Sequence, residues 1–270
     1  MDIKDRTRIP FYQVDAFTST KVFSGNPAGV CVLEGPLEDG IMQQIAAENN
    51  LAETAFIRTD LKPFQIRWFT PTVEVDLCGH ATLAAAYVLF NEKNVKDIIQ
   101  FQSLRSGELM VTANEDLLTL DFPIDQIIPI GIKNEWIKAI GSPILEAYTG
   151  RTDLILRVEN EAFVKKIQPN LESIKRWPYV GVIVTAEGTD VDFVSRFFGP
   201  AVGIDEDPVT GSAHTSLVAY WSQELKKTKL KARQESKRQG DLLCEINGER
   251  ALITGNAQLY LKGEIYVPNH

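Results

Sequence analysis

The chain carries one short pattern twice. Residues 67–75 read RWFTPTVEV, and residues 196–204 read RFFGPAVGI at a constant offset of 129. After an insertion of three residues the match continues, with CGHA at 78–81 and TGSA at 210–213. A repeat of this length is too long to be one unit of a solenoid. It therefore predicts two similar domains, each with a strand, a proline turn, an acidic loop and a helix that begins at glycine.

Short runs of β-branched or alternating apolar residues predict most of the strands. These runs cover residues 28–33, 54–57, 64–69, 98–102, 117–122, 154–158, 180–185, 192–198 and 258–267. Helices are predicted over residues 37–50, 80–92 and 212–225. Because the last two are so apolar, we expect them to be core helices packed inside a curved sheet.

The domain boundary is expected near residues 117–134, where proline turns interrupt an Ile-rich strand pattern. We therefore place an N-terminal domain at residues 1–120 and a C-terminal domain at residues 121–257. Residues 258–268 are predicted to cross back and complete the first domain, because chain ends often pair with early strands.

Composition excludes several classes of protein. The chain has 270 residues, 44% hydrophobic and 24% charged, as in an ordinary folded protein. Its formal net charge is −8, and we interpret its one basic run, residues 226–238, as a solvated segment, so no nucleic-acid partner is expected. Three widely spaced cysteines argue against a disulfide framework and a structural zinc site. Without a visible signal peptide or a run of about 18 apolar residues, a cytoplasmic protein that does not enter membranes is predicted.

Two glycines, Gly79 and Gly211, hold equivalent positions at the starts of the repeated helices. A helix N-terminus leaves backbone N–H groups without intrahelical partners and carries partial positive charge, and glycine lets a ligand approach the backbone. If the two domains face one another, both helix starts point into one cleft that would bind a small carboxylate. We therefore expect the active site in the cleft between the domains, although either glycine could be a turn residue only.

Three side chains in the first domain could carry chemistry. His80 is expected in the first turn of its helix, where the helix dipole lowers its pKa and favours the neutral form, unless it is only a structural hydrogen-bonding group. Cys78 could be a nucleophile beside His80 or a small buried hydrophobic residue. Glu53 lies between apolar residues at the entrance to a strand, where a carboxylate can carry a proton near neutrality, unless its side chain points to solvent.

The second repeat offers Asp207 and Ser212. Asp207 precedes a proline, and Ser212 stands at the helix start, so the two could form an N-capping arrangement and nothing more. The same pair could instead orient a substrate and a catalytic side chain.

Several motifs together resemble the PhzF-like family, which contains the phenazine-biosynthesis isomerase and its relatives. They run in family order, with VDAF at 14–17, GNPA at 25–28, NLAETAF at 50–56, FTP at 69–71, CGHAT at 78–82 and DEDPVTGSA at 205–213. The resemblance implies an α+β fold of the diaminopimelate-epimerase type, with two pseudo-symmetric domains, each a β-barrel-like sheet around a central α-helix. It also implies a homodimer and an active site that needs no cofactor, and we expect no metal.

The resemblance places the catalytic glutamate of the family on Glu53 and the supporting positions on His80, Asp207 and Ser212. It implies a cofactor-independent isomerase that moves a proton and a double bond in a small carboxylate substrate. Glu53 would remove the proton and return it elsewhere on the same face. His80 and Asp207 would orient the substrate, while Ser212 and the backbone at the two helix starts would hold its carboxylate.

Epimerases of the same fold use two cysteines, one from each repeat, as acid and base. Here Cys78 takes the first position, and Thr210, whose hydroxyl is too weakly acidic, takes the second. Both residues are expected to contact substrate, but a two-thiol racemase would need another acid in place of Thr210. Two alternatives remain open: a non-catalytic protein that binds a small carboxylate, and a hydrolase or transferase that uses the thiol of Cys78 with His80.

Overall fold

The computed structural model describes residues 6–96 and 98–268, which form two compact units. Unit 1 contains the described residues of 1–16, 27–120 and 256–270, and unit 2 contains residues 17–26 and 121–255. The sequence-based boundaries had placed residues 17–26 in the first domain, and this was wrong. The segment is held in unit 2 because the Gly25 N–H donates to the carbonyl of Gln239 (2.7 Å), while the Arg238 side chain donates to the carbonyl of Gly25 (2.8 Å).

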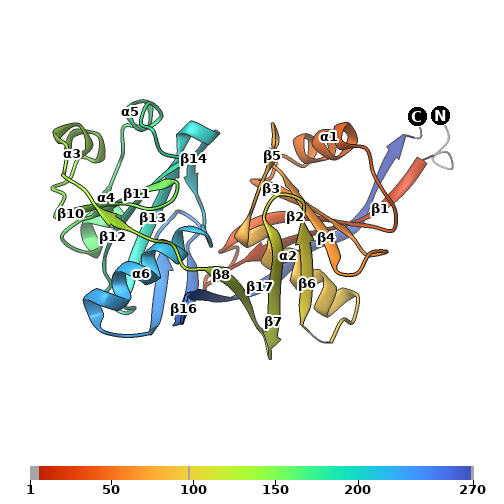
Figure 1. Cartoon of the computed structure of the whole chain (residues 1–270). Coiled ribbons are helices and arrows are strands. Elements are labelled where there is room, and N and C mark those ends of the chain that lie inside the picture. The colour runs from red at the N-terminus through yellow and green to blue at the C-terminus, as the bar shows by residue number, and fades with distance from the viewer. Residues whose placement is uncertain (1–5, 97, 269–270) are drawn as a thin grey trace. The chain divides into compact units, whose positions relative to one another are not determined.

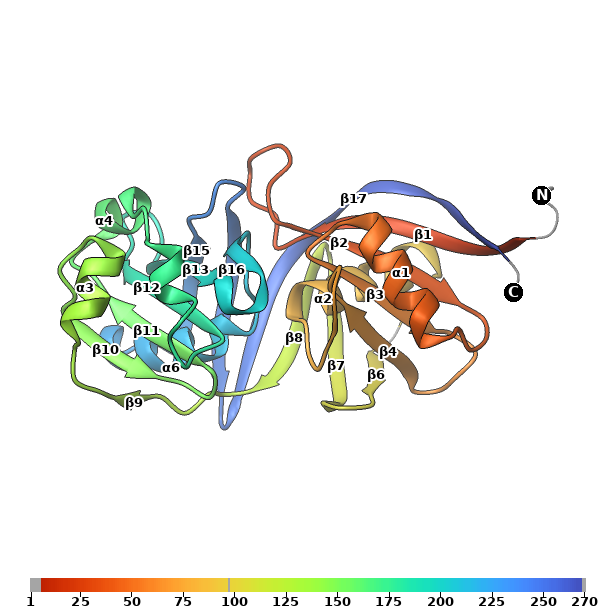
Figure 2. The ribbon, with the colours of Figure 1, turned by 90° about the horizontal axis from the view of Figure 1, so that it is seen from above.

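Unit 1 combines a curved set of strands with two helices. The strands are β1 (Arg6–Ala16), β2 (Asn26–Leu33), β3 (Glu53–Arg58), β4 (Phe64–Phe69), β5 (Glu74–Val75), β6 (Ile99–Ser103), β7 (Gly107–Asn114), β8 (Leu117–Pro123) and the later part of β17 (Arg250–Pro268). The helices are α1 (Asp39–Asn49) and α2 (Gly79–Tyr87). Strand β3 pairs parallel to β2 and antiparallel to β4, and β1 pairs antiparallel to β17 (Figure 2).

Helix α2 is the central helix of unit 1. Every residue from Gly79 to Ala86 is buried, and the helix packs against β1 and β3 (Figure 1). The predicted core helix over residues 80–92 is confirmed, although its last turn is a π-helix over Val88–Glu92. Helix α1 covers the other face of the strands, where Ile45 belongs to a core with Phe56 and Phe69.

Unit 2 is built in a similar way. Its strands are β9 (Ile128–Pro129), β10 (Glu146–Thr149), β11 (Asp153–Arg157), β12 (Gly181–Glu187), β13 (Phe193–Gly199), β14 (Ile204–Asp207), β15 (Lys229–Gln234), β16 (Gly240–Asn247) and the first residues of β17. Its α-helices are α3 (Asn134–Ile140), α4 (Glu161–Lys166), α5 (Leu171–Ile174) and α6 (Ala213–Leu225). As in unit 1, a parallel pair, β11 and β12, is followed by an antiparallel partner, β13.

Helix α6 is the central helix of unit 2, as the sequence predicts. The Trp221 indole N–H donates to the Thr185 hydroxyl of β12 (2.9 Å), and the indole stacks on Phe193 of β13 with centroids 5.8 Å apart. On the opposite face of these strands, helices α3, α4 and α5 enclose a second apolar core that includes Trp136 and Phe198.

The strand pairing corrects the position of the insertion in the repeat. Trp68 pairs with Val75, and its counterpart Phe197 pairs with Asp207, so Val75 and Asp207 are equivalent. The three-residue insertion therefore precedes the short strand rather than following it. Two ion pairs agree with this register. The Arg67 guanidinium contacts the Glu74 carboxylate (2.7 and 2.9 Å), as Arg196 contacts Glu206 (2.6 and 3.0 Å).

Several elements lay outside the sequence-based prediction. These are strands β1, β5, β7, β9, β10, β14, β15 and β16, and helices α3, α4 and α5. Strand β15 lies in the basic run 226–238, where Leu230 and Ala232 point inward between exposed lysines. The run was therefore wrongly interpreted as a solvated segment, because its charges alternate with buried residues.

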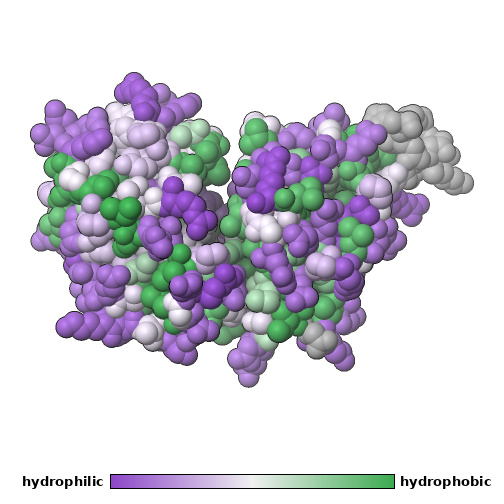
Figure 3. All heavy atoms as spheres, in the orientation of Figure 1, coloured by the Kyte–Doolittle hydropathy of each residue, from purple (hydrophilic) through white to green (hydrophobic). Residues whose placement is uncertain are grey.

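The surface of each unit mixes hydrophilic and hydrophobic residues on the face seen in Figure 3. Within the part of the chain that the structure describes, no helix has the length and apolar character needed to span a membrane.

Candidate active site

Glu53 and His80 form a buried contact in unit 1. Glu53 begins β3, which parallel pairing places beside Ala28 of β2, and His80 is the second residue of α2. Oε2 of Glu53 lies 3.1 Å from Nε2 of His80. Only 7% of Glu53 and 3% of His80 are exposed. The packing of α2 against β3 therefore brings together a carboxylate and an imidazole that are 27 positions apart in the sequence.

Cys78 also lies close to the imidazole. It is the N-cap residue of α2, and its Sγ is 3.5 Å from Nδ1 of His80. Thr82 fixes this helix start, since its hydroxyl donates to the carbonyl of Cys78 at 2.6 Å. Gly79, between Cys78 and His80, is buried. The imidazole thus has both a thiol and a carboxylate close to it.

The surroundings of His80 favour its charged form. Burial lowers the pKa of His80, but the neighbouring Cys78 and Glu53 outweigh it and hold the pKa well above its ordinary value. The sequence-based expectation that the helix start lowers the pKa of His80 was therefore wrong, because a carboxylate at 3.1 Å acts more strongly than the helix dipole.

Burial works against a thiolate at Cys78. Burial and the charge of Glu53 raise the pKa of Cys78 to about 11. A nucleophilic cysteine instead needs an environment that lowers its pKa. The environment of Cys78 therefore disfavours the alternative function, a hydrolase or transferase that uses this thiol.

Asp207 and Thr210 form a second buried cluster, in unit 2. The Thr210 hydroxyl donates to Oδ2 of Asp207, and the Asn26 amide donates to Oδ1 at 2.8 Å. Gln234 completes the cluster, because its amide donates to the carbonyl of Asp207 (2.8 Å) and its oxygen accepts from the Thr210 N–H (2.9 Å). The carboxylate of Asp207 is therefore held at both oxygens in a fixed orientation.

Sequence reasoning did not select Asn26 or Gln234 as site residues. Asn26 belongs to the GNPA motif, which offered a signal, since that motif contributes to the family resemblance. Gln234 offered none, because it reaches Thr210 only through the pairing of β13 with β15.

Ser212 and Gly211 stand at the start of α6. Gly211 is buried, whereas Ser212 is exposed and its side chain makes no capping hydrogen bond. The capping role considered for the Ser212 side chain is thus absent. Instead, His214 contacts the carbonyl of Thr210 through Nδ1 at 2.8 Å. Thr82 makes the corresponding contact in α2.

The carboxylate of Glu53 has no counterpart at the equivalent position of unit 2. The pairing of Ala28 with Glu53 corresponds to that of Asp153 with Gly181, so Gly181 replaces Glu53. The Phe197 ring fills the space, since a Cβ atom built on Gly181 would lie 2.1 Å from it. The buried carboxylate–imidazole pair is thus a feature of unit 1.

The same three residues of unit 1 could hold a metal ion. The ligand atoms of Glu53, Cys78 and His80 all lie within 4.8 Å of one another, and this is the one such cluster among the described residues.

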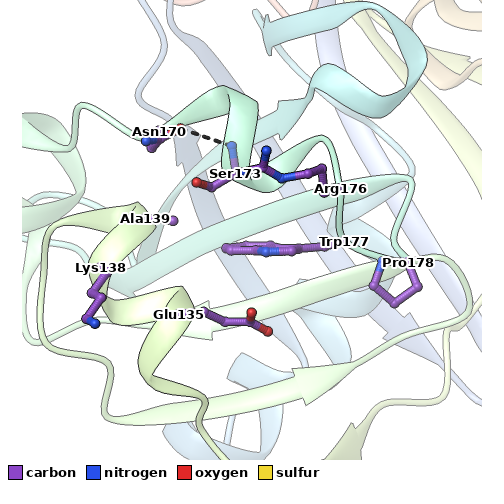
Figure 4. Close-up of a pocket in the computed structure, with 8 residues that line it drawn as sticks. All are labelled: Glu135, Lys138, Ala139, Asn170, Ser173, Arg176, Trp177 and Pro178. Atoms are coloured by element: carbon purple, nitrogen blue, oxygen red, sulfur yellow. Dashed lines mark hydrogen bonds between the residues drawn. The ribbon is translucent and has the colours of Figure 1, made fainter.

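A surface pocket of about 470 Å³ lies elsewhere, in unit 2. Trp177 lies across it, with Asn170 and Ser173 on one side and Glu135 on the other (Figure 4). None of the predicted site residues lines this pocket. It therefore does not belong to the candidate active site.

Comparisons with known proteins agree on one family. The family profile described as phenazine biosynthesis-like protein (PhzC-PhzF) matches residues 14–263. An uncharacterized isomerase of Pseudomonas aeruginosa is 48% identical over 259 residues, which cover 96% of this chain and 98% of that protein. A phenazine biosynthesis-like domain-containing protein of Mus musculus is 42% identical and covers 96% of this chain and 99% of its own length.

Solved structures extend the similarity to the fold. A PhzF-family phenazine biosynthesis protein from Enterococcus faecalis matches with a TM-score of 0.93 and 49% identity, over 97% of this chain and all of that chain. A predicted epimerase from Pseudomonas aeruginosa has a TM-score of 0.73 at 19% identity, over 95% of this chain and 99% of that chain. A hydroxyproline epimerase from Agrobacterium vitis has a TM-score of 0.62 at 10% identity, over 97% of this chain and 93% of that chain. At these low identities the two epimerases speak for the fold alone, and the predicted α+β epimerase-like fold is confirmed.

Proposed function

The chain belongs to the PhzC-PhzF family of phenazine biosynthesis-like proteins and is an isomerase, and from this premise we propose that Glu53 is its acid–base group. In this proposal Glu53 moves a proton within a small unsaturated carboxylate, without a cofactor. The observation that carries it is the buried contact of 3.1 Å between Glu53 and His80.

The proposed reaction breaks a carbon–hydrogen bond next to an unsaturated system. The proton passes to the Glu53 carboxylate, and the electron pair of the broken bond delocalises into the substrate. The Glu53 carboxyl group, whose proton can exchange with solvent, then returns a proton to another carbon on the same face, which moves the double bond and leaves the enzyme unchanged. No redox partner is needed, because the substrate and product are isomers.

His80 and the start of α2 would stabilise the negative charge that develops on the substrate. Donors positioned before the reaction contribute a large part of the rate in such steps. The first N–H groups of a helix favour anions, and Gly79 leaves the backbone there open to close approach. These features support a carboxylate-bearing substrate.

The residues of unit 2 have supporting roles in the proposal. Asp207 is held at both oxygens, which suits a group that orients a ligand. Ser212 is exposed, and its hydroxyl could donate to a carboxylate. The expectations that Thr210 and Gly211 contact substrate, and that the active site lies between the two domains, stay predictions, as does the homodimer.

The decisive experiment follows proton exchange in heavy water by mass spectrometry. A panel of small unsaturated and amino carboxylates is incubated with wild type and with Glu53→Gln. We expect wild type to incorporate deuterium into at least one compound, and Glu53→Gln to do so at least about 100-fold more slowly, since a general base contributes that much. Equilibrium binding of the same compound should persist in the variant.

Glu235→Gln is the matched control, because Glu235 is also 7% exposed but lies in unit 2 outside the predicted site. It should exchange at the wild-type rate. Near-wild-type exchange by Glu53→Gln would disprove the assignment. Binding without exchange by wild type would instead favour the non-catalytic carboxylate-binding protein.

A further inference from the structure

Three different donor atoms meet beside α2. The Sγ of Cys78 lies 4.0 Å from Nε2 of His80, and that nitrogen lies 3.1 Å from Oε2 of Glu53. The ligand atoms of the three residues are all within 4.8 Å of one another. Sulfur, nitrogen and oxygen donors are therefore grouped closely enough to share one ion.

These separations approach those around a tetrahedral zinc ion. Zinc bonds of about 2.3 Å to sulfur and about 2.0–2.1 Å to nitrogen or oxygen place neighbouring ligands roughly 3.3–3.6 Å apart. The two separations measured from Nε2 of His80 lie within about half an ångström of these values, so small side-chain rotations suffice. A mixed set of thiolate, imidazole and carboxylate suits Zn²⁺ and its chemical relatives, and not Mg²⁺ or Ca²⁺.

The other two cysteines do not offer such a site. Cys31 and Cys244 are buried, and neither belongs to a group of potential ligands among the described residues. Among the three cysteines, Cys78 is therefore the one that lies in a group of potential metal ligands within the described residues.

We propose that Glu53, Cys78 and His80 bind one thiophilic divalent cation, such as Zn²⁺, and that the bound ion blocks proton transfer by Glu53. Binding releases the protons of the thiol and the imidazole to solvent and leaves a fourth coordination position for water. The ion occupies the carboxylate and fixes the imidazole, so the metal-bound form cannot accept a substrate proton. The inhibition of proton transfer rests on the proposed function, whereas the binding of the metal ion does not.

Cobalt(II) reports the site directly, because a cobalt–thiolate bond gives a charge-transfer absorption band and tetrahedral cobalt gives intense visible bands. The full chain, stripped of metal with a chelator, is titrated with Co²⁺. We expect a thiolate band that saturates at one equivalent in wild type and is absent in Cys78→Ala and Cys78→Ser. Glu53→Gln and His80→Asn should bind at least about tenfold more weakly. Cys244→Ala, the matched control, should keep the full band.

Absence of the band in wild type, or its persistence in both Cys78 variants, would overturn the site. Loss of the band in Cys244→Ala would do the same. Circular dichroism of each variant separates loss of a ligand from loss of the fold.

The block is tested by measuring proton exchange with the metal-free chain and after one equivalent of Zn²⁺. We expect exchange to stop with Zn²⁺ and to return with chelator, and unchanged exchange at full occupancy would refute the block. If cobalt binds as expected but the metal-free chain exchanges no proton, the metal site stands and the proposed isomerase mechanism fails.

Discussion

Single residues account for the difference between the two units. The parallel pair Ala28–Glu53 of unit 1 corresponds to Asp153–Gly181 of unit 2. The carboxylate therefore stands on the second strand of the pair (β3) in unit 1 and on the first strand (β11) in unit 2. Glu53 meets His80, whereas Asp153 is buried beside Asp125 and receives a hydrogen bond from the Gly181 N–H. The two units thus differ at these positions, with a carboxylate–imidazole pair in unit 1 and a buried acid without a basic partner among the causes of its pKa shift in unit 2.

Asp153 makes stability depend on pH. Burial raises the pKa of Asp153 to about 6, although hydrogen bonds from Thr152 and Gly181 oppose the rise. The unfolded pKa is about 3.9, so the folded state binds this proton more tightly, and stability is lost as the pH rises through about 6. Asp153→Asn should therefore be more stable than wild type at pH 8 by up to about 3 kcal/mol, and nearly equal to it at pH 4.

Urea denaturation at the two pH values measures this difference. Asp190→Asn, at an exposed position, is the control and should differ little from wild type at either pH. A gain for Asp153→Asn of the same size at pH 4 and pH 8 would contradict the role of the charge.

The two central helices, α2 and α6, begin in the same structural setting. A short strand precedes each central helix, and an Arg–Glu ion pair links that strand to the strand before it. Arg67 and Glu74 form this pair between β4 and β5, and Arg196 and Glu206 form it between β13 and β14. At each helix start, a side chain one turn along reaches back to the carbonyl of the residue before the glycine. The Thr82 hydroxyl makes this contact in α2, and Nδ1 of His214 makes it in α6.

Thr82→Val tests this contact at the start of α2. Valine keeps the shape of the side chain but removes the hydroxyl that donates to the carbonyl of Cys78. We expect a loss of about 1 kcal/mol in the free energy of unfolding, measured by urea denaturation. Thr112→Val, on an exposed strand position, should change it by less than about 0.5 kcal/mol. Equal effects of the two variants would show that the hydroxyl contributes nothing.

At the scale of the whole molecule, one strand belongs to both units. Strand β17 begins in unit 2, and from residue 256 onward it lies in unit 1, where it pairs with β1. Ile265 pairs with Ile9 and packs against the core beneath α1. The first unit therefore depends on the last residues of the chain.

A chain that ends at Gly255 should lose stability in unit 1 selectively. Removal of the later part of β17 deprives β1 of one of its two neighbouring strands, the other being β2, so amides of β2, β3 and β4 should exchange with solvent at least about tenfold faster. Hydrogen exchange followed by mass spectrometry measures this, and a chain ending at Pro268 is the control. An equal loss of protection in β11, β12 and β13 of unit 2 would show that the later part of β17 does not stabilise unit 1 selectively.

The sequence alone determined the family, the epimerase-like fold, the two core helices and strands such as β2, β3 and β13, since these depend on local patterns and ordered motifs. Glu53 and His80 could be selected because each stands at a recognisable strand or helix start. Their contact, the raised pKa of His80 and the Asn26–Asp207 hydrogen bond across 181 positions were decided by the tertiary structure. The physical reason is that strand pairing and helix packing set which distant groups meet. Local sequence cannot fix the resulting electrostatic environment.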